Sequence, residues 1–326
     1  MKKTMLIIGI LILVFTVATA CLNNQEVPMI NIDESIKMYI VADPHYMSEK
    51  MTENSDTYTN YLNSVDRLMR YTGVFLDVVE DDIKNDKPDI VVFPGDLTNN
   101  GSKVNHLEFE KRLERIKKTG TKVYVVPGNH DLNNGKALHF KDDKIYITDN
   151  INEEDFTEIY SDYGYDEAIS RDENTLSYLV KPYKNFWLLM LDTTKDYPAP
   201  GGYINRDTLS WIVSCSDMAK EENAEMIVVM HHNLLDHSDI IWEDYTVDNN
   251  TSVLNTFHEM GIQVVLSGHI HIQDYKSNTS IENGNTIYDI ATSSLPVFAH
   301  QYGQLMYSPS NGYDYETIKL DVEKYA

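Results

Sequence analysis

Short apolar runs alternate with longer amphipathic segments along this chain from residue 36 onward. The short runs have the length and composition of buried strands, which we expect at residues 37–42, 89–94, 122–127, 177–181, 186–191, 225–230, 262–266 and 286–291. The longer segments repeat apolar residues at helical spacing, which predicts helices over about 58–86, 102–119, 151–162, 205–222 and 250–260. This alternation is typical of an α/β fold in which strands are buried between helices.

Two regions depart from the alternation. The apolar segments 286–291 and 315–321 follow one another without a clear helix between them, so the sheet is expected to be mixed, with antiparallel hairpins toward the C-terminus. Residues 132–176 hold many charges and few strand signals. We interpret them as an insertion over one face of the domain, at the rim of a functional site.

The first 21 residues have a different composition from the rest. Lys2 and Lys3 precede an apolar run that ends in small residues before Cys21, which is the pattern of a secretory signal. Small residues before a cysteine also resemble a bacterial lipobox, although Ala18 stands where leucine is commoner. We therefore expect a signal peptide at 1–21 and a lipid anchor at Cys21 that holds the protein on the outer side of the cell membrane.

Two alternatives remain for this segment: secretion without a lipid, and an uncleaved membrane helix, for which the apolar run is slightly short. All three readings place the domain outside the cytoplasm. Residues 22–35 are polar and are expected to form a short tether, and residues 36–326 are expected to form one domain.

Overall composition limits the classes of partner. The chain has 326 residues, of which 42% are hydrophobic, enough for a sizeable core. Its formal net charge of −24 repels polyanions, so nucleic-acid recognition is not expected. The two cysteines exclude a disulfide framework, and Cys215 is expected to be a small buried hydrophobe.

Five of the predicted strands are followed directly by polar side chains that can bind metal. The sequences are MYIVADPH, IVVFPGD, VYVVPGNHD, MIVVMHH and VVLSGHIH. Each motif alone is more often a surface turn, but strand ends of an open α/β sheet converge at one edge. Carboxylate, imidazole and carboxamide groups are ligands for borderline divalent ions. The five motifs together therefore predict a metal site.

The local geometry of these motifs can be anticipated in part. Gly128 and Gly268 stand where a strand must turn sharply and backbone must closely approach another group. Asp43 and His45 are two positions apart, as are the two histidines of GHIH. We expect each pair to point the same way from an extended chain.

The ordered set D-x-H, G-D, G-N-H-D, H and G-H-x-H resembles the calcineurin-like metallophosphoesterase superfamily, over roughly residues 36–298. The resemblance implies a four-layer α/β/β/α sandwich with two mixed β-sheets and two divalent ions, which could be Mn, Fe, Zn or Co. It implies ligands for one ion at Asp43, His45 and His271, ligands for the other at Asn129, His231 and His269, and a shared bridge at Asp96. His231 is preferred to His232 because the family's histidine usually follows the strand immediately.

The resemblance also implies the chemistry. A hydroxide that bridges the two ions attacks phosphorus in line, and the ions stabilise the developing charge. His130 is the candidate catalytic residue, which protonates or stabilises the leaving alkoxide. Asp131 is expected to orient an imidazole.

Departures from well-known branches narrow the function. Purple acid phosphatases carry a tyrosine where this chain has Asn99, and protein Ser/Thr phosphatases carry GDxVDRG where this chain has GDLTNNG. GDLTNNG and GNHD are more similar to bacterial class III cyclic-nucleotide phosphodiesterases. The expected activity is a phosphodiesterase acting on a small phosphoester. A phosphomonoesterase of extracellular substrates and a non-catalytic metal-binding lipoprotein are the alternatives, and the substrate, the metals and the oligomeric state stay open.

Overall fold

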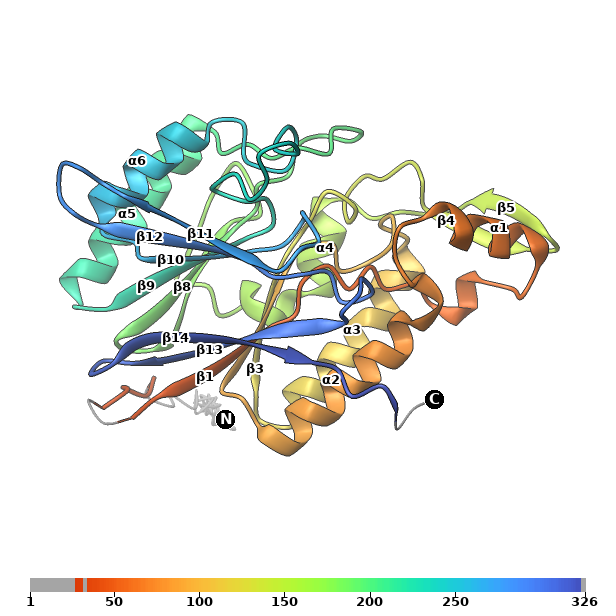
Figure 1. Ribbon diagram of the computed structural model, residues 1–326, viewed down its shortest axis with the longest axis horizontal. Helices are drawn as coiled ribbons and strands as arrows, with labels where there is room; N and C mark the ends of the chain where they lie inside the picture. Colours follow the sequence, from red (N-terminus) through yellow and green to blue (C-terminus); the bar gives the residue numbers. More distant parts are fainter. Residues whose placement is uncertain (1–26, 32–33, 324–326) are drawn as a thin grey trace, which may run out of the picture.

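The computed structural model describes residues 27–31 and 34–323 (Figure 1). The expected signal peptide and Cys21 therefore lie outside the described residues. Within the expected tether, Ile30 is buried and its backbone exchanges two hydrogen bonds of 2.9 Å with the Asn185 side chain. Among the described helices, none combines the length and apolar character needed to cross a membrane.

The first sheet has five strands in the order β14-β13-β1-β2-β3. Their bounds are β1 (Ile36–Ile40), β2 (Ile90–Pro94), β3 (Lys122–Val126), β13 (Gln301–Ser308) and β14 (Gly312–Lys319). Strands β1, β2 and β3 are parallel, whereas β13 is antiparallel to both of its neighbours. The carboxyl ends of the three parallel strands therefore lie at one edge of this sheet.

The second sheet has seven strands in the order β11-β12-β10-β9-β8-β7-β6. Their bounds are β6 (Ser170–Arg171), β7 (Tyr178–Tyr183), β8 (Phe186–Leu191), β9 (Glu225–Met230), β10 (Val264–Ser267), β11 (Asp274–Thr279) and β12 (Thr286–Ala291). The four central strands are parallel, and antiparallel strands flank them on both sides. Both sheets are mixed, with antiparallel hairpins toward the C-terminus, as predicted.

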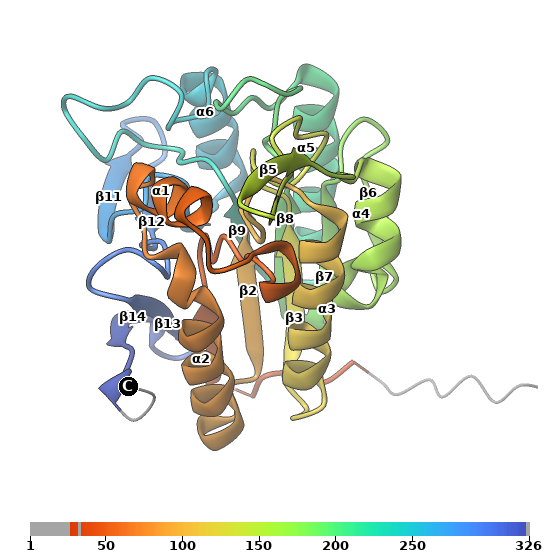
Figure 2. The ribbon, with the colours of Figure 1, turned by 90° about the vertical axis from the view of Figure 1, so that its right-hand side faces the viewer.

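The two sheets face each other and helices cover their outer faces (Figures 1 and 2). The covering helices are α2 (Thr72–Asp86) and α3 (Lys103–Lys117) on the first sheet, and α5 (Arg206–Glu221) and α6 (Asn250–Met260) on the second. This is the four-layer α/β/β/α arrangement expected from the sequence.

Strand β8 is apolar at every position because both of its faces are buried. From Phe186 to Met190 the even-numbered residues pack into the core between the two sheets. From Trp187 to Leu191 the odd-numbered residues pack into a second core under α5 and α6. Because successive side chains point to opposite faces, a strand buried on both faces must be apolar at every position.

The remaining elements lie beside the sandwich. They are α1 (Asp56–Ser64), the β4–β5 hairpin (Leu138–Lys141 and Lys144–Ile147), α4 (Glu153–Ile159), and short helical turns at Glu49–Met51, Met69–Tyr71 and Ser161–Tyr165. Figure 2 shows α1 and the hairpin on the same side of the molecule. Phe140 of the hairpin packs on Tyr58 of α1, with 5.0 Å between ring centroids.

One expected helix is wrong in its extent. The sequence predicts a continuous helix over 58–86, but the helix ends at Ser64 and resumes only at Met69. Leu68 is half exposed, and its backbone N–H donates to the Pro296 carbonyl oxygen at 2.9 Å. This contact with a distant part of the chain takes the place of a helical hydrogen bond. The helical spacing of apolar residues therefore does not predict where the helix is interrupted.

Candidate metal centre

Side chains that follow strands of both sheets meet at one edge of the sandwich. Asp43, His45, Asp96 and His271 each place one oxygen or nitrogen within 4.8 Å of the others. His45 Nε2 lies 3.0 Å from His271 Nε2 and 3.6 Å from Asp96 Oδ2, and His271 Nε2 lies 3.9 Å from Asp43 Oδ1. These are the four residues expected around one ion, counting the bridge.

A second group adjoins the first. His231 Nε2 lies 3.0 Å from Asn129 Oδ1, 3.1 Å from His269 Nδ1 and 3.4 Å from Asp96 Oδ1. Asp96 therefore turns one carboxylate oxygen toward His45 and the other toward His231. A carboxylate placed in this way is suited to bridge two ions.

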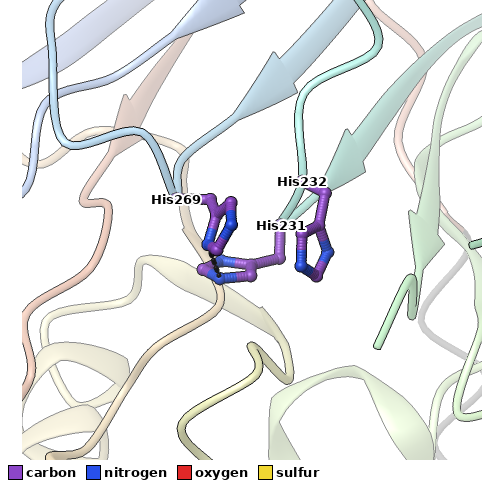
Figure 3. A group of neighbouring side chains, drawn as sticks. All are labelled: His231, His232 and His269. Atoms are coloured by element: carbon purple, nitrogen blue, oxygen red, sulfur yellow. Dashed lines mark hydrogen bonds between the residues drawn. The ribbon is translucent and has the colours of Figure 1, made fainter. Parts of the chain in front are cut away.

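His231 and His232 are neighbours in sequence but differ in what they offer (Figure 3). His232 also lies close to His231 and His269, but its Nδ1 contacts Thr193 Oγ1 at 2.8 Å and its Nε2 contacts the Pro200 carbonyl oxygen at 2.9 Å. In His231, by contrast, the backbone engages Nδ1, which contacts the Pro94 carbonyl oxygen at 2.9 Å. That contact fixes the tautomer and leaves the Nε2 lone pair directed into the group, as a ligand requires.

The backbone at these residues is strained. Five of the seven candidate ligands have positive φ: Asp43 (45°), His45 (44°), Asp96 (46°), His269 (66°) and His271 (61°). Such conformations are uncommon for residues other than glycine, and five of them at one site indicate that the surrounding structure holds these residues in place. The expectation of an extended chain at D-x-H and H-x-H is therefore wrong, because left-handed residues turn both side chains into the site.

Two glycines allow the motifs to approach one another, as expected. A Cβ atom on Gly128 would lie 2.3 Å from Asp96 Oδ1, and one on Gly268 would lie 2.4 Å from Asp43 Oδ2. Neither contact is sterically possible, so a side chain at either position would displace a candidate ligand.

The electrostatics of the centre favour a bound cation. Burial, and then the charge of Asp96, raise the pKa of Asp43 well above its usual value. Burial lowers the pKa of His269 to about 3 and of His271 to about 4, so both imidazoles are neutral at neutral pH. Neutral imidazole nitrogens and carboxylate oxygens that converge in a buried space are the donors that divalent transition metals prefer. The residues therefore fit two such ions.

His130 stands beside the candidate ligands. Its backbone N–H donates to Asp96 Oδ1 at 2.9 Å, and its ring centroid is 4.8 Å from that of His45. Its Nδ1 lies 2.8 Å from Asn100 Oδ1, and burial lowers the pKa of the ring. Asn100 was not anticipated from the sequence. Its signal in the sequence is its position in GDLTNNG, four residues after Asp96, and the structure gives it a left-handed φ of 60°.

Asp131 contacts an imidazole, as expected, but it is that of His106, whose Nε2 lies 3.2 Å from the Asp131 backbone carbonyl oxygen, and not one of the metal centre. Its carboxylate accepts hydrogen bonds from the backbone N–H groups of Leu97, Thr98 and Gly128, at 2.9–3.0 Å. The His106 Nε2 to Asp131 Oδ1 distance is 3.9 Å. Asp131 therefore ties the GDLT loop to the GNHD turn, and Asn100 is the residue that contacts His130.

A cavity of about 350 Å³ opens over the centre. Its floor includes Asp96, Asn129 and His130, and its walls include Arg67 and residues 243–245. The backbone carbonyl of Asp244 contacts His269 Nε2 at 2.9 Å, which joins this wall to a candidate ligand. Residues 132–176 contribute no described residue to the cavity lining, so their expected place at the rim stays a prediction.

Known proteins with similar sequence or structure identify the family and the fold of this chain. The model of the family described as calcineurin-like phosphoesterase matches residues 36–273. A curated protein named "Probable glycerophosphodiester phosphodiesterase GpdQ", from Arcobacter nitrofigilis, is 22% identical over 189 residues. That match spans 57% of this chain and 57% of the relative.

Two solved structures show a similar fold at 13% identity. A dimetal phosphatase from Danio rerio superposes with a TM-score of 0.57 over 88% of this chain and 99% of its own. The purple acid phosphatase PPD1 from yellow lupin superposes with a TM-score of 0.53 over 88% of this chain and 54% of its own.

Proposed function

Since this chain belongs to the calcineurin-like phosphoesterase family, and is therefore a phosphoester hydrolase, we propose that it uses two divalent ions to cleave small phosphodiesters. The observation that carries the proposal is Asp96, whose two carboxylate oxygens face two different groups of donors. Such a carboxylate is what a pair of neighbouring ions shares.

The residues divide between the two ions in this proposal. Asp43, His45 and His271 would hold one ion. Asn129, His231 and His269 would hold the other, with Asp96 shared between them. When bound, the ions supply Lewis acidity for the phosphoryl oxygens and lower the pKa of a water molecule.

His130 would act on the leaving group. Its Nδ1 is engaged by Asn100, which holds the ring and leaves Nε2 for the oxygen that departs from phosphorus. The ring lies in the lining of the cavity, where a substrate would sit. With Nδ1–H donating to Asn100 Oδ1, His130 would carry a transferable proton on Nε2 in its doubly protonated form, and would become neutral as the alkoxide takes that proton and the ester bond breaks.

Two observations favour a diester over a monoester. The curated relative is named for hydrolysis of a glycerophosphodiester, and the GDLTNNG and GNHD motifs are similar to those of cyclic-nucleotide phosphodiesterases. A cavity of about 350 Å³ fits a small molecule. Glycerophosphodiesters and cyclic nucleotides are the diester classes to compare first.

The test is turnover of bis(p-nitrophenyl) phosphate and p-nitrophenyl phosphate by the purified protein, with Mn²⁺ and after chelation. We expect chelator-sensitive turnover that favours the diester, followed by hydrolysis of glycerophosphoethanolamine or 3′,5′-cyclic AMP under the same conditions. Preference for the monoester would change the assignment to a phosphatase. Absence of turnover in protein shown to hold two ions would contradict the proposal.

A further inference from the structure

Arg67 reaches the catalytic cavity from a segment that contains none of the metal-binding motifs. It lies in the break between α1 and the turn Met69–Tyr71, and it lines the same cavity as Asp96 and His130. Its side chain is 10% exposed, and its Nε–H is buried without a hydrogen-bond partner. A guanidinium taken out of water with a donor unsatisfied is costly unless an anion completes its bonds.

The neighbours of Arg67 do not complete those bonds. Its Nη1 lies 3.1 Å from Oδ1 of Asp66, which also lines the cavity, but the Asp66 side chain is 74% exposed and the pair leaves the Arg67 Nε–H without a partner. Among the described residues that line the cavity, Arg67 is the only arginine or lysine. The charge of Arg67 acts on the centre. Burial lowers the pKa of His45 and of His271 most, and the charge of Arg67 lowers both further.

Contacts of the two residues that follow Arg67 hold its backbone in place. The next residue, Leu68, donates its backbone N–H to Pro296 at 2.9 Å. Met69 is buried in a small apolar cluster with Tyr58 and Phe140. The fold therefore fixes the backbone that carries Arg67, and the side chain is 10% exposed.

We propose that Arg67 binds a non-bridging phosphoryl oxygen of the substrate and is the positively charged protein group that orients the phosphoester over the two ions. This inference rests on the proposed function, because it needs a phosphoester in that cavity. The N–H donors of a guanidinium match the spacing of phosphate oxygens, and hydrogen bonds between charged partners are stronger than neutral ones. Lysine at this position would keep the charge but lose the paired donors.

The test compares inorganic phosphate binding by calorimetry in the Mn²⁺-loaded full-length protein and in the variants Arg67→Ala and Arg67→Lys. We expect Arg67→Ala to raise the Kd for phosphate by about tenfold or more, with Arg67→Lys between it and the unaltered protein. Metal content, measured by mass spectrometry, should not change. Added guanidinium ion should restore diester turnover to Arg67→Ala, which the loss of a structural contact would not allow.

Arg70→Ala is the matched control, because Arg70 lies on the adjacent turn, stacks over Tyr58 at 5.7 Å and does not line the cavity. It should bind phosphate like the unaltered protein. Unchanged phosphate affinity in Arg67→Ala would overturn the inference, and so would weaker phosphate binding that merely follows loss of metal. Phosphate binding that depends on Arg67 in a protein without diester turnover would uphold this inference while refuting the proposed function.

Discussion

Two groups of histidine and aspartate side chains have similar composition but opposite protonation of their histidines. In the candidate metal centre, imidazole nitrogens face one another, as at His45 and His271, and burial keeps the rings neutral. In the second group, the His237 ring lies between two carboxylates, with Nδ1 3.1 Å from Asp274 Oδ2 and Nε2 3.3 Å from Asp289 Oδ2. Burial opposes protonation of His237, but Asp289 and Asp274 outweigh it and raise the pKa.

The difference lies in which positive charge balances the carboxylates. Asp289 accepts hydrogen bonds from the backbone N–H groups of Leu234 and Leu235 and from the Ser267 hydroxyl, at 2.7–2.8 Å. A single proton on His237 then balances the remaining charge. In the candidate metal centre, backbone N–H groups of His269 and His130 also donate to Asp43 and Asp96, but the neighbouring imidazoles of His269 and His271 are neutral and supply no balancing positive charge. Divalent ions would supply it. Composition alone therefore does not separate a metal site from an ion pair.

Exchanging one carboxylate in each group should give the largest contrast. We expect Asp96→Asn to lower diester turnover on the order of a thousandfold and to reduce the metal content, because the shared ligand is lost. Asp289→Asn should keep both ions and most of the turnover but lower the free energy of unfolding by about 3 kcal/mol. Turnover assays, mass spectrometry and chemical denaturation measure these effects. Retention of two ions by Asp96→Asn would contradict the assigned bridge.

Substitution of His130, in the first group, should affect catalysis but not metal binding. His130→Ala should lower kcat on the order of a hundredfold while both ions remain, since the ring is placed at the leaving group and not among the ligands. Asn100→Ala, which only releases the ring, should cost about tenfold. Steady-state kinetics with metal analysis tests both. If His130→Ala lost an ion, His130 would have to be counted with the ligands.

His237 should make stability depend on pH. Its pKa in the folded protein is raised above the ordinary 6.5, so the folded state holds the proton more tightly than the unfolded state. The stabilisation is complete below about pH 6.5 and is lost as pH rises through the folded pKa. His237→Gln should therefore cost about 2 kcal/mol at pH 6 and less at pH 9. Denaturation at both pH values, with His139→Gln on the β4–β5 hairpin as control, measures this. An equal cost at both values would refute the role of the proton.

Much of the centre could be predicted because its signals are local. A buried strand followed at once by Asp, Asn or His is visible in the sequence, and the expected strands β1, β2, β3, β9 and β10 bring those residues together. The confirmed burial of Cys215 likewise follows from the amphipathic pattern of α5.

Features that depend on distant contacts could not be predicted. Arg67 enters the cavity because Leu68 bonds to Pro296, and nothing near Leu68 in sequence reveals that contact. Strand β13, with the sequence QYGQLMYS, is interrupted by polar residues and glycine, and it is specified by its pairing with β1 and β14. Asp289 stands inside a predicted strand, and only the tertiary structure shows that its oxygens are occupied.

The division of the candidate ligands between the two sheets has a consequence for how the protein matures. Asp43 and His269 are 226 positions apart, yet the backbone N–H of His269 donates to the Asp43 carboxylate at 3.0 Å. During synthesis the first sheet's donors emerge long before those of the second, and neither half alone contains a full set for two ions. We expect metal capture to be a late event that follows docking of the sheets. The metal content of newly made protein would then report how many molecules have finished folding.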